Sequence, residues 1–264
     1  MIKNEKTVGV IGGLGPEATL DFYAKLIQKT QATSDQEHLQ VIINSNPKVP
    51  NRQDALLGDG PSCAPSLIDS AKALERAGAD FLVMVCNTAH AYEHHIKSAV
   101  PLPFVSIINE SVQACFHNMP IMQRVGLLAA DGCLAANLYQ TEFKRAGVEC
   151  LTPTDANQQE LMELIFQIKA NDHDLGTSLK IEQLAQNLID QGADVILAAC
   201  TEVPLVLKPE ILSVPLVNST DALVDGVLAF AKSGDGAFKP PWFTSKNDRQ
   251  SRHAFITSST MINA

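Results

Sequence analysis

Residues 78–86 read GADFLVMVC and residues 192–200 read GADVILAAC, and the fold prediction starts from this repeat. The glycine, alanine, aspartate and cysteine of one copy match those of the other, and each pair is 114 positions apart (78 and 192, 86 and 200). Each copy ends in a short apolar run, which is typical of a buried strand. The chain therefore contains the same strand twice, with a cysteine at the carboxyl end of each copy.

The repeat extends upstream of these strands. Residues 67–77 and 181–191 both place apolar residues at three- and four-residue intervals, which predicts an amphipathic helix before each strand. Further back, the apolar runs 8–11 and 125–128 are each followed by a turn and another predicted helix. Short apolar strands that alternate with amphipathic helices indicate parallel sheets covered on both faces.

We therefore predict an α/β fold of two pseudo-symmetric lobes, each a parallel sheet sandwiched by helices. The N-terminal lobe is expected to comprise residues 1–112 and 219–232, and the C-terminal lobe residues 113–218; residues 233–264 form a polar tail. Ligands of open α/β sheets bind beyond the carboxyl ends of the strands. Because both repeated cysteines stand at such ends, the active site is expected in the cleft between the lobes.

The composition excludes several classes of protein. The 264 residues are 45% hydrophobic and 19% charged, which is typical of a globular protein. The net charge is -9 and no basic patch stands out, so no nucleic-acid partner is expected. No apolar run is long enough to cross a bilayer, and the first strand begins too early for a signal peptide, so we expect a cytoplasmic protein without a membrane partner. The six cysteines contain no CxxC pair, so we expect free thiols and no metal site.

Cys86 and Cys200 differ from an ordinary buried cysteine. A single cysteine in an apolar run, such as Cys115 or Cys133, is usually a small hydrophobic core residue. Cys86 and Cys200, by contrast, are each followed at once by small polar residues and a predicted helix start. A thiol at a helix N-terminus faces unpaired amides and the positive end of the helix dipole, which lower its pKa. We therefore predict that both thiols are reactive.

Two thiols on opposite sides of one carbon atom are suited to racemisation. A thiolate removes the α-proton from one face, and a thiol returns a proton to the other. Because the roles exchange with the handedness of the substrate, the site needs two similar groups rather than an unlike acid and base. No cofactor is expected, so the protein itself must stabilise the carbanion. Asn87, Thr88 and Thr201 are placed to bind the carboxylate on which charge develops.

The glycine-rich turn GGLGPEAT at residues 12–19 has two interpretations. Read from Gly13, it fits the GxGxxA pattern of dinucleotide-binding proteins, which would make the chain an oxidoreductase. That pattern also needs an acidic residue at the end of the second strand, and residues 40–43 are followed by Asn-Ser-Asn instead. We therefore favour a tight turn that lets a substrate approach the backbone at Gly13 and Leu14.

Four charged or titratable residues are candidates for the site, and each also has an ordinary structural explanation. Arg52 is either a solvated charge or a bidentate clamp on a substrate carboxylate. Lys169 ends a predicted helix, where a lysine also complements the helix dipole. His90 and Glu202 each lie within a turn of a repeated cysteine, where they either orient groups in the site or cap a helix.

Together these motifs resemble the aspartate/glutamate racemase family. The similarity covers about residues 7–232 and is carried by four motifs: GGLGPEAT at 12–19, Pro50-x-Arg52, CNTAH at 86–90 and CTEVPL at 200–205. The likeness is greatest to aspartate racemases and their broad-specificity relatives, because glutamate racemases typically carry histidine in place of Glu202. The resemblance implies a two-lobed fold, cofactor-free catalysis by Cys86 and Cys200, and a homodimer.

The resemblance also implies a set of substrate-binding residues. It makes Arg52 and Lys169 carboxylate-binding residues, while Leu14 replaces a methionine that is frequent in the glycine turn. The complete predicted set is Arg52, Asn87, Thr88, Lys169, Thr201, Glu202, Gly13 and Leu14.

Two positions depart from the family pattern. Residues 129–132 read AADG, where the family usually offers threonines to the substrate carboxylate, and Asn218 stands where aspartate is common. The first change removes one expected anion contact, which suggests an altered substrate preference.

The sequence leaves three functions open. The first is racemisation of an acidic amino acid, L-aspartate to D-aspartate, with glutamate as a further substrate. The second is another isomerase or lyase of the same superfamily acting on a related diacid, although decarboxylation needs only one thiol. The third is a non-catalytic amino-acid-binding protein on the same scaffold, which the loss of threonines near Ala130 favours. We favour the racemase, whose expected partners are a small acidic amino acid and a second copy of the chain.

Overall fold

The computed structural model describes residues 5–58 and 60–232. The predicted polar tail, residues 233–264, lies outside the described residues. Within the described part of the chain, no helix is long and apolar enough to cross a membrane.

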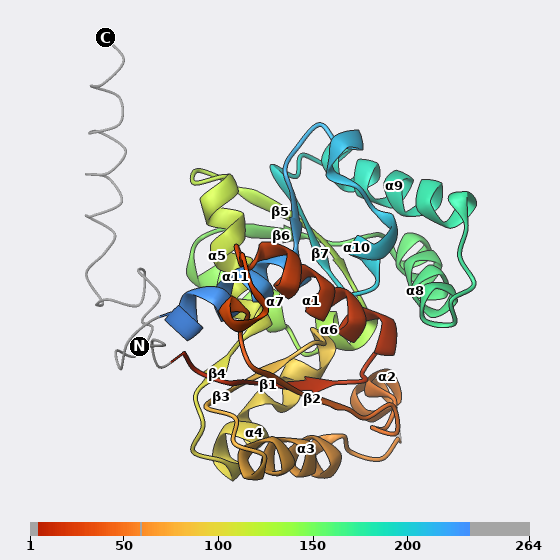
Figure 1. The fold of residues 1–264 in the computed structure, drawn as a ribbon. Coiled ribbons are helices and arrows are strands. Elements are labelled where there is room, and N and C mark those ends of the chain that lie inside the picture. The colour runs from red at the N-terminus through yellow and green to blue at the C-terminus, as the bar shows by residue number, and fades with distance from the viewer. Residues whose placement is uncertain (1–4, 59, 233–264) are drawn as a thin grey trace. The chain divides into compact units, whose positions relative to one another are not determined.

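The described strands form two parallel sheets of four strands each (Figure 1). The first sheet has the strand order β2-β1-β3-β4, and the second has the equivalent order β6-β5-β7-β8. The predicted pseudo-symmetric α/β fold is therefore confirmed, since each half of the chain uses the same strand order. The strands are β1 Val8–Gly12, β2 Val41–Ser45, β3 Phe81–Met84, β4 Phe104–Val105, β5 Arg124–Ala129, β6 Glu149–Leu151, β7 Val195–Ala199 and β8 Leu216–Asn218.

Helices cover both faces of each sheet (Figure 1). Helices α3 and α4 pack on the outer face of the first sheet, and α8, α9 and α10 pack on the outer face of the second. Helices α1, α5, α7 and α11 lie between the two sheets, in one apolar cluster that includes residues of both sheets. The helices are α1 Pro16–Lys29, α2 Arg52–Leu57, α3 Ala64–Arg76, α4 Glu93–Ala99, α5 Ile107–Asn118, α6 Asp131–Ala135, α7 Leu138–Arg145, α8 Asp155–Lys169, α9 Leu175–Asp190, α10 Val203–Val206 and α11 Ser219–Lys232, with short 3-10 helices η1 Asp35–Glu37, η2 Thr88–Tyr92 and η3 Pro209–Ile211.

Alternate residues of each central strand face opposite apolar layers. In β3, Phe81 and Val83 belong to the cluster between the sheets, whereas Leu82 and Met84 pack with α3 and α4. Strand β7 alternates in the same way between the central cluster and the layer formed by α8 and α9. Because successive side chains of a strand point to opposite faces, a strand buried on both sides has to be apolar throughout. This explains the uninterrupted apolar runs in both copies of the repeat.

The Gly-Ala-Asp motif has the same structural function in both copies. The glycines of the two copies have φ values of +93° and +95°, a conformation that glycine adopts without steric strain at the end of a helix. The aspartates then bind the backbone at the start of the neighbouring strand. Asp80 accepts a hydrogen bond from the Thr7 N–H at 2.7 Å, and Asp194 accepts one from the Arg124 N–H at 2.9 Å. The repeated motif therefore ends a helix and fixes the register of two adjacent strands.

The predicted domain bounds stay a prediction. Residue 112 lies within α5, and α11 packs against both α1 and α5. The apolar cluster between the sheets contains residues from both predicted lobes.

Glu110 on α5 is buried where α5 crosses α11, and only 9% of the residue is exposed. A side chain at Gly226 of α11 would collide with the Glu110 carboxyl group, so the two helices approach closely here. Burial, and to a smaller extent the negative charge of Asp225, raises the pKa of Glu110 to about 7. Asp225 is itself ion-paired with Lys29 of α1 at 2.9 Å.

We expect Glu110→Gln to change the pH dependence of stability. Folded Glu110 holds its proton up to about pH 7, whereas the same group has an ordinary pKa of 4.5 in the unfolded chain. Its contribution to stability is therefore complete below pH 4.5 and is lost as the pH rises through 7. The loss is at most on the order of 3 kcal/mol. Compared with wild type, Glu110→Gln should raise the free energy of unfolding in urea at about pH 8 but not at about pH 5.

The matched control is Glu142→Gln. Glu142 pairs with Arg145 on the outer surface of α7. We therefore expect the free energy of unfolding of Glu142→Gln to be no higher than that of wild type at high pH. An equal effect of Glu110→Gln at both pH values would contradict the proposed titration.

Candidate active site

Cys86 and Cys200 lie just beyond the carboxyl ends of the equivalent strands β3 and β7. Both line one cavity of about 340 Å3. Six of the eight residues predicted to bind substrate line the same cavity: Arg52, Asn87, Thr88, Lys169, Thr201 and Glu202. The other two, Gly13 and Leu14, are not among the described residues that line it. The fold thus brings residues from both copies of the repeat to one cavity.

The carboxylate of Glu202 connects the second cysteine to Lys169. Its Oε1 atom accepts a hydrogen bond from Lys169 Nζ, and its Oε2 atom accepts one from the Cys200 thiol at 3.0 Å. The Thr201 hydroxyl donates a further hydrogen bond to Oε2 at 3.2 Å. Glu202 is only 3% exposed, so its charge depends on these partners. A side chain at Gly15 would collide with this carboxylate, and the glycine turn therefore leaves space for Glu202.

The prediction that a helix N-terminus lowers the pKa of Cys200 is wrong. Helix α10 has only four residues, so its dipole is weak. Burial raises the pKa of the Cys200 thiol well above its usual value, and the negative charge of Glu202 raises it further. The positive charge of Lys169 acts in the opposite direction and is outweighed. Cys200 is therefore a thiol in the free protein.

Lys169 remains charged although it is largely enclosed. Burial lowers its pKa, but the opposing influences, chiefly the negative charge of the neighbouring Glu202 carboxylate, outweigh burial, so the net shift is upward. Its ammonium group is therefore a lasting positive charge close to both cysteines, and Glu202 is the partner that balances this charge.

On the other side of the cavity, His90 holds the backbone at Cys86. The backbone N–H of Ile107 donates a hydrogen bond to His90 Nε2 at 3.2 Å, so Nε2 is unprotonated. His90 Nδ1 then carries the proton and donates to the Cys86 carbonyl oxygen at 2.8 Å. Burial lowers the pKa of His90, which keeps this ring neutral. His90 does not line the cavity, and it positions Cys86 through the main chain.

The side chain of Asn87 is engaged in a buried network. Its Nδ2 atom donates to the Ser219 hydroxyl at 3.1 Å, and its Oδ1 atom accepts a hydrogen bond from the Tyr139 hydroxyl. Tyr139 is fully buried, and its hydroxyl oxygen lies 3.3 Å from the Ser111 hydroxyl, which can donate to it. Asn87 therefore fixes the loop after β3 against helices α5, α7 and α11.

Arg52 joins the glycine turn to the loop after β2. Its Nη2 atom donates to the Leu14 carbonyl at 2.7 Å, and its Nη1 atom donates to the Pro50 carbonyl at 3.1 Å. Leu14 is 1% exposed and packs in the apolar layer with α3 and α4. Gly13, with φ of +79°, donates its N–H to Thr19 Oγ1 at 2.9 Å. The Leu14 carbonyl thus supports the guanidinium group of Arg52, and the Gly13 N–H is occupied by Thr19.

Sequence reasoning missed the wall that α8 contributes to the cavity. Met162, Ile165 and Phe166 line the cavity with Lys169, at the three- and four-residue spacing of one helix face. Counted back from Lys169, this spacing could have predicted which residues of α8 share its face. Gln53, also missed, lines the cavity next to Arg52.

The segment that departs from the family pattern, residues 129–132, also reaches the cavity. Ala130 lines it, and the Gly132 N–H that follows donates to Gln53 Oε1 at 2.6 Å. Asn218, the other departure, does not line the cavity. Its Oδ1 atom accepts a hydrogen bond from the Thr220 N–H at 2.8 Å and so caps helix α11.

The thiol and acidic side chains of the described residues do not gather into a metal-binding cluster. Among residues 5–58 and 60–232, no group of three or more His, Cys, Asp or Glu side chains is placed to hold a metal ion. All six cysteines are free thiols, as predicted.

Comparison with known proteins assigns the chain to a family. A family model described as Asp/Glu/Hydantoin racemase matches residues 11–227. The chain belongs to this family. Among its relatives, the broad specificity amino-acid racemase RacX of Bacillus subtilis (strain 168) is 30% identical over 226 residues, which cover 84% of this chain and 96% of the relative. The family predicted from the cysteine motifs is confirmed, and so is the assignment to the amino-acid racemases.

Solved structures of the family have the same fold. The aspartate racemase of Picrophilus torridus matches with a TM-score of 0.76 and 28% identity, over 86% of this chain and 94% of that chain. An aspartate racemase homologue from Pyrococcus horikoshii OT3 matches with a TM-score of 0.70 and 27% identity, over 86% of this chain and 100% of that chain. The racemase fold therefore extends over the part of the chain that carries both cysteines.

We expect Glu202→Gln to lower the pKa of Cys200. The substitution keeps a hydrogen-bond acceptor near the thiol but removes the negative charge that disfavours the thiolate, and it leaves Lys169 unbalanced. The pH midpoint for alkylation of Cys200 by iodoacetamide, followed by peptide mass spectrometry, should fall by about one pH unit or more. Glu142→Gln, which changes an ion pair outside the cavity, serves as the control. An unchanged or higher midpoint in Glu202→Gln would show that Glu202 does not set the state of Cys200.

Proposed function

We propose that this chain interconverts the L and D enantiomers of a free α-amino acid by moving its α-proton between Cys86 and Cys200, without pyridoxal phosphate. The observation that carries the proposal is the presence of both thiols in one cavity, each at the end of an equivalent strand. A pseudo-symmetric fold can present one reactive group to each face of a carbon atom bound between its halves.

The hydrogen bond from Cys200 to Glu202 gives the two thiols different starting roles. Racemisation needs one thiolate as base and one thiol as acid. Because burial and Glu202 keep Cys200 protonated, Cys86 is the base in the first half-reaction. The bond between the α-carbon and its hydrogen breaks as a new S–H bond forms on Cys86. The Cys200 proton is then delivered to the opposite face of the α-carbon, which leaves Cys200 as the thiolate.

The residues around the cysteines support stabilisation of the carbanion. As the α-proton leaves, negative charge spreads into the substrate carboxylate, and positive groups nearby lower the energy of this intermediate. Arg52 supplies a guanidinium group held by the Leu14 and Pro50 carbonyls, and Thr88 and Thr201 line the cavity beside the two cysteines. Arg52 is therefore our candidate for binding the α-carboxylate.

The identity of the amino acid depends on the groups that would contact its side chain. Aspartate is the substrate suggested by the sequence motifs, with glutamate second, and the cationic side chains that line the cavity are Arg52 and Lys169, the latter paired with Glu202. The relatives point in two directions, because one is named an aspartate racemase and another a broad specificity amino-acid racemase. Acidic and uncharged amino acids should therefore be tested side by side. The homodimer and the cytoplasmic location stay predictions.

A non-catalytic amino-acid-binding protein is the alternative that one observation favours. Ala130 lines the cavity where a threonine hydroxyl was expected to hold the substrate. Another isomerase or a lyase acting on a diacid is disfavoured, because a decarboxylase would need only one of the two thiols. Binding of an amino acid without exchange of its α-proton would support the non-catalytic alternative.

The first test is exchange of the α-proton in D2O. Purified, reduced protein without pyridoxal phosphate is incubated with an L-amino acid, and proton NMR and chiral chromatography follow loss of the α-proton signal and formation of the D-enantiomer. Cys86→Ala and Cys200→Ala should each reduce racemisation by about 100-fold or more, because each removes one proton-transfer group. Cys150→Ala, which changes a cysteine outside the cavity, should retain it. Full activity in Cys86→Ala would refute the two-thiol mechanism.

A further inference from the structure

The charged groups in the cavity leave little capacity for a second substrate carboxylate. The charged side chains lining the cavity are Arg52, Lys169 and Glu202. Lys169 and Glu202 form an ion pair, so together they contribute no net charge. With one cysteine as thiolate, the positive charge of Arg52 is balanced as well. The cavity is then electrically neutral, which suits a zwitterionic amino acid with an uncharged side chain.

The backbone donors at the start of α6 are already occupied. The Gly132 N–H donates to Gln53 Oε1 at 2.6 Å, and the Asp131 N–H faces the Met162 sulfur at 3.4 Å. Gln158 Nε2 donates to Asp131 Oδ1 at 2.7 Å and fixes this carboxylate beside Ala130. A substrate carboxylate at this end of the cavity would find no free backbone donor at these two positions. Asp131 does not itself line the cavity, but it follows the lining residue Ala130 in the chain, and its negative charge disfavours a second carboxylate nearby.

The adjoining wall is apolar. Ala130, Met162, Ile165 and Phe166 line the cavity, and three of these side chains come from one face of α8. Burying a charged carboxylate against apolar groups costs free energy, whereas burying methylene groups there contributes favourably. The wall therefore favours a side chain that is uncharged and extends beyond the β-carbon.

We propose that the preferred substrates are amino acids with uncharged side chains, which pack on the α8 wall and against Ala130, and that aspartate and glutamate are poor substrates. This inference rests on the proposed racemase function and specifies its substrate class. Arg52 then binds the α-carboxylate, which is present in every α-amino acid. Lys169 is committed to Glu202 and tunes Cys200 instead of binding a second carboxylate.

The test compares substrates of equal size and different charge. Glutamine and glutamate differ at one terminal group, so the ratio of their kcat/KM values for α-proton exchange isolates the effect of charge. We expect this ratio to be about 10 or more in favour of glutamine. Methionine should likewise be exchanged at least about 10-fold better than alanine, because its side chain reaches the α8 wall.

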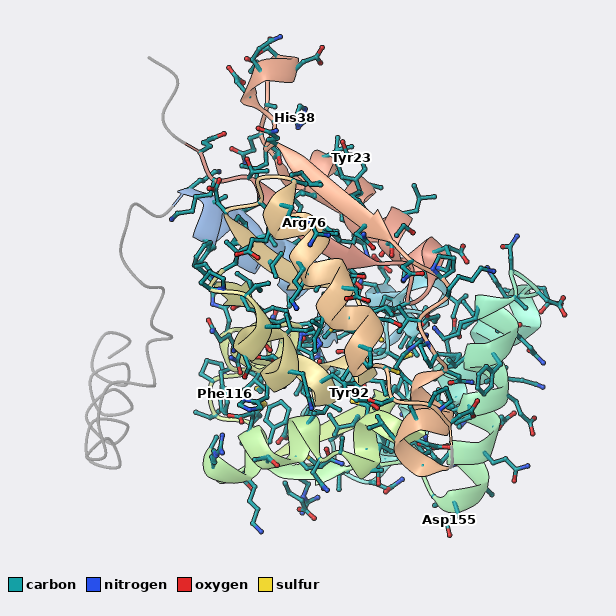
Figure 2. All side chains as sticks on the ribbon, turned by 90° about the horizontal axis from the view of Figure 1, so that it is seen from below. Tyr23, His38, Arg76, Tyr92, Phe116 and Asp155 are labelled. Atoms are coloured by element: carbon teal, nitrogen blue, oxygen red, sulfur yellow. The ribbon has the colours of Figure 1, made fainter. Side chains whose placement is uncertain are left out.

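A single isosteric substitution tests whether the negative charge of Asp131 disfavours acidic substrates. Asp131→Asn keeps an oxygen that accepts the hydrogen bond from Gln158 but removes the negative charge beside Ala130. It should raise kcat/KM for glutamate several-fold, by about the effect of one nearby charge, and leave glutamine unchanged. The matched control is Asp155→Asn, because Asp155 is exposed at the start of α8, at the outer edge of the molecule in Figure 2.

The outcomes separate this inference from the proposed function. Exchange that favours glutamine and methionine supports both. Exchange that favours aspartate or glutamate by 10-fold or more overturns the substrate class and leaves the two-thiol racemase intact. Absence of α-proton exchange with every one of these amino acids overturns the proposed function and this inference with it.

Discussion

The apolar cluster between the two sheets is the constraint on which the site depends. Strands β3 and β7 each direct alternate side chains into this cluster, where helices α1, α5, α7 and α11 contact both sheets. The carboxyl ends of the two strands are therefore held in a fixed relation, and Cys86 and Cys200 come two residues and one residue after those ends. A shift of one residue in either strand would move its cysteine to the opposite face of the sheet. The hydrogen bonds of Asp80 and Asp194 to adjacent strands hold the register that prevents such a shift.

Much of this arrangement was predictable from the sequence because it is repeated there. Periodicity gave the strands and helices, and the offset between the two copies related one cysteine to the other. The expectation of a shared site then followed from the general rule that ligands of open α/β sheets bind beyond the carboxyl ends of the strands. The strand order was not predicted. The repeat carries this information because both copies contain a strand that is buried on both faces and must therefore be apolar throughout.

The interactions of the charged groups were not predictable in the same way. Lys169 was identified as a substrate-binding residue, but its pairing with Glu202 depends on the fold, since the two residues are 33 positions apart. The expected lowering of the Cys200 pKa failed for a related reason. A helix start can be read from a sequence, whereas burial of the thiol and the position of the Glu202 carboxylate can only be seen once the chain is folded. The α8 wall could have been predicted from the helical spacing of its residues. It was missed because these residues carry no reactive or charged group.

The two halves of the site are symmetric in their backbone and asymmetric in their electrostatics. Cys86 is positioned through its carbonyl oxygen by a neutral histidine, His90, whereas the Cys200 thiol donates a hydrogen bond to a buried carboxylate, Glu202. A perfectly symmetric pair would give each thiol the same affinity for the proton, and neither role would be preferred in the free enzyme. The Glu202 carboxylate removes this degeneracy. Lys169 neutralises Glu202, so under the proposed mechanism the interaction that sets the starting roles of the cysteines also leaves Lys169 without a charge for the substrate. The proposed proton transfer and the proposed side-chain selectivity are then coupled through one ion pair, and we expect a change at either of its members to alter both properties together.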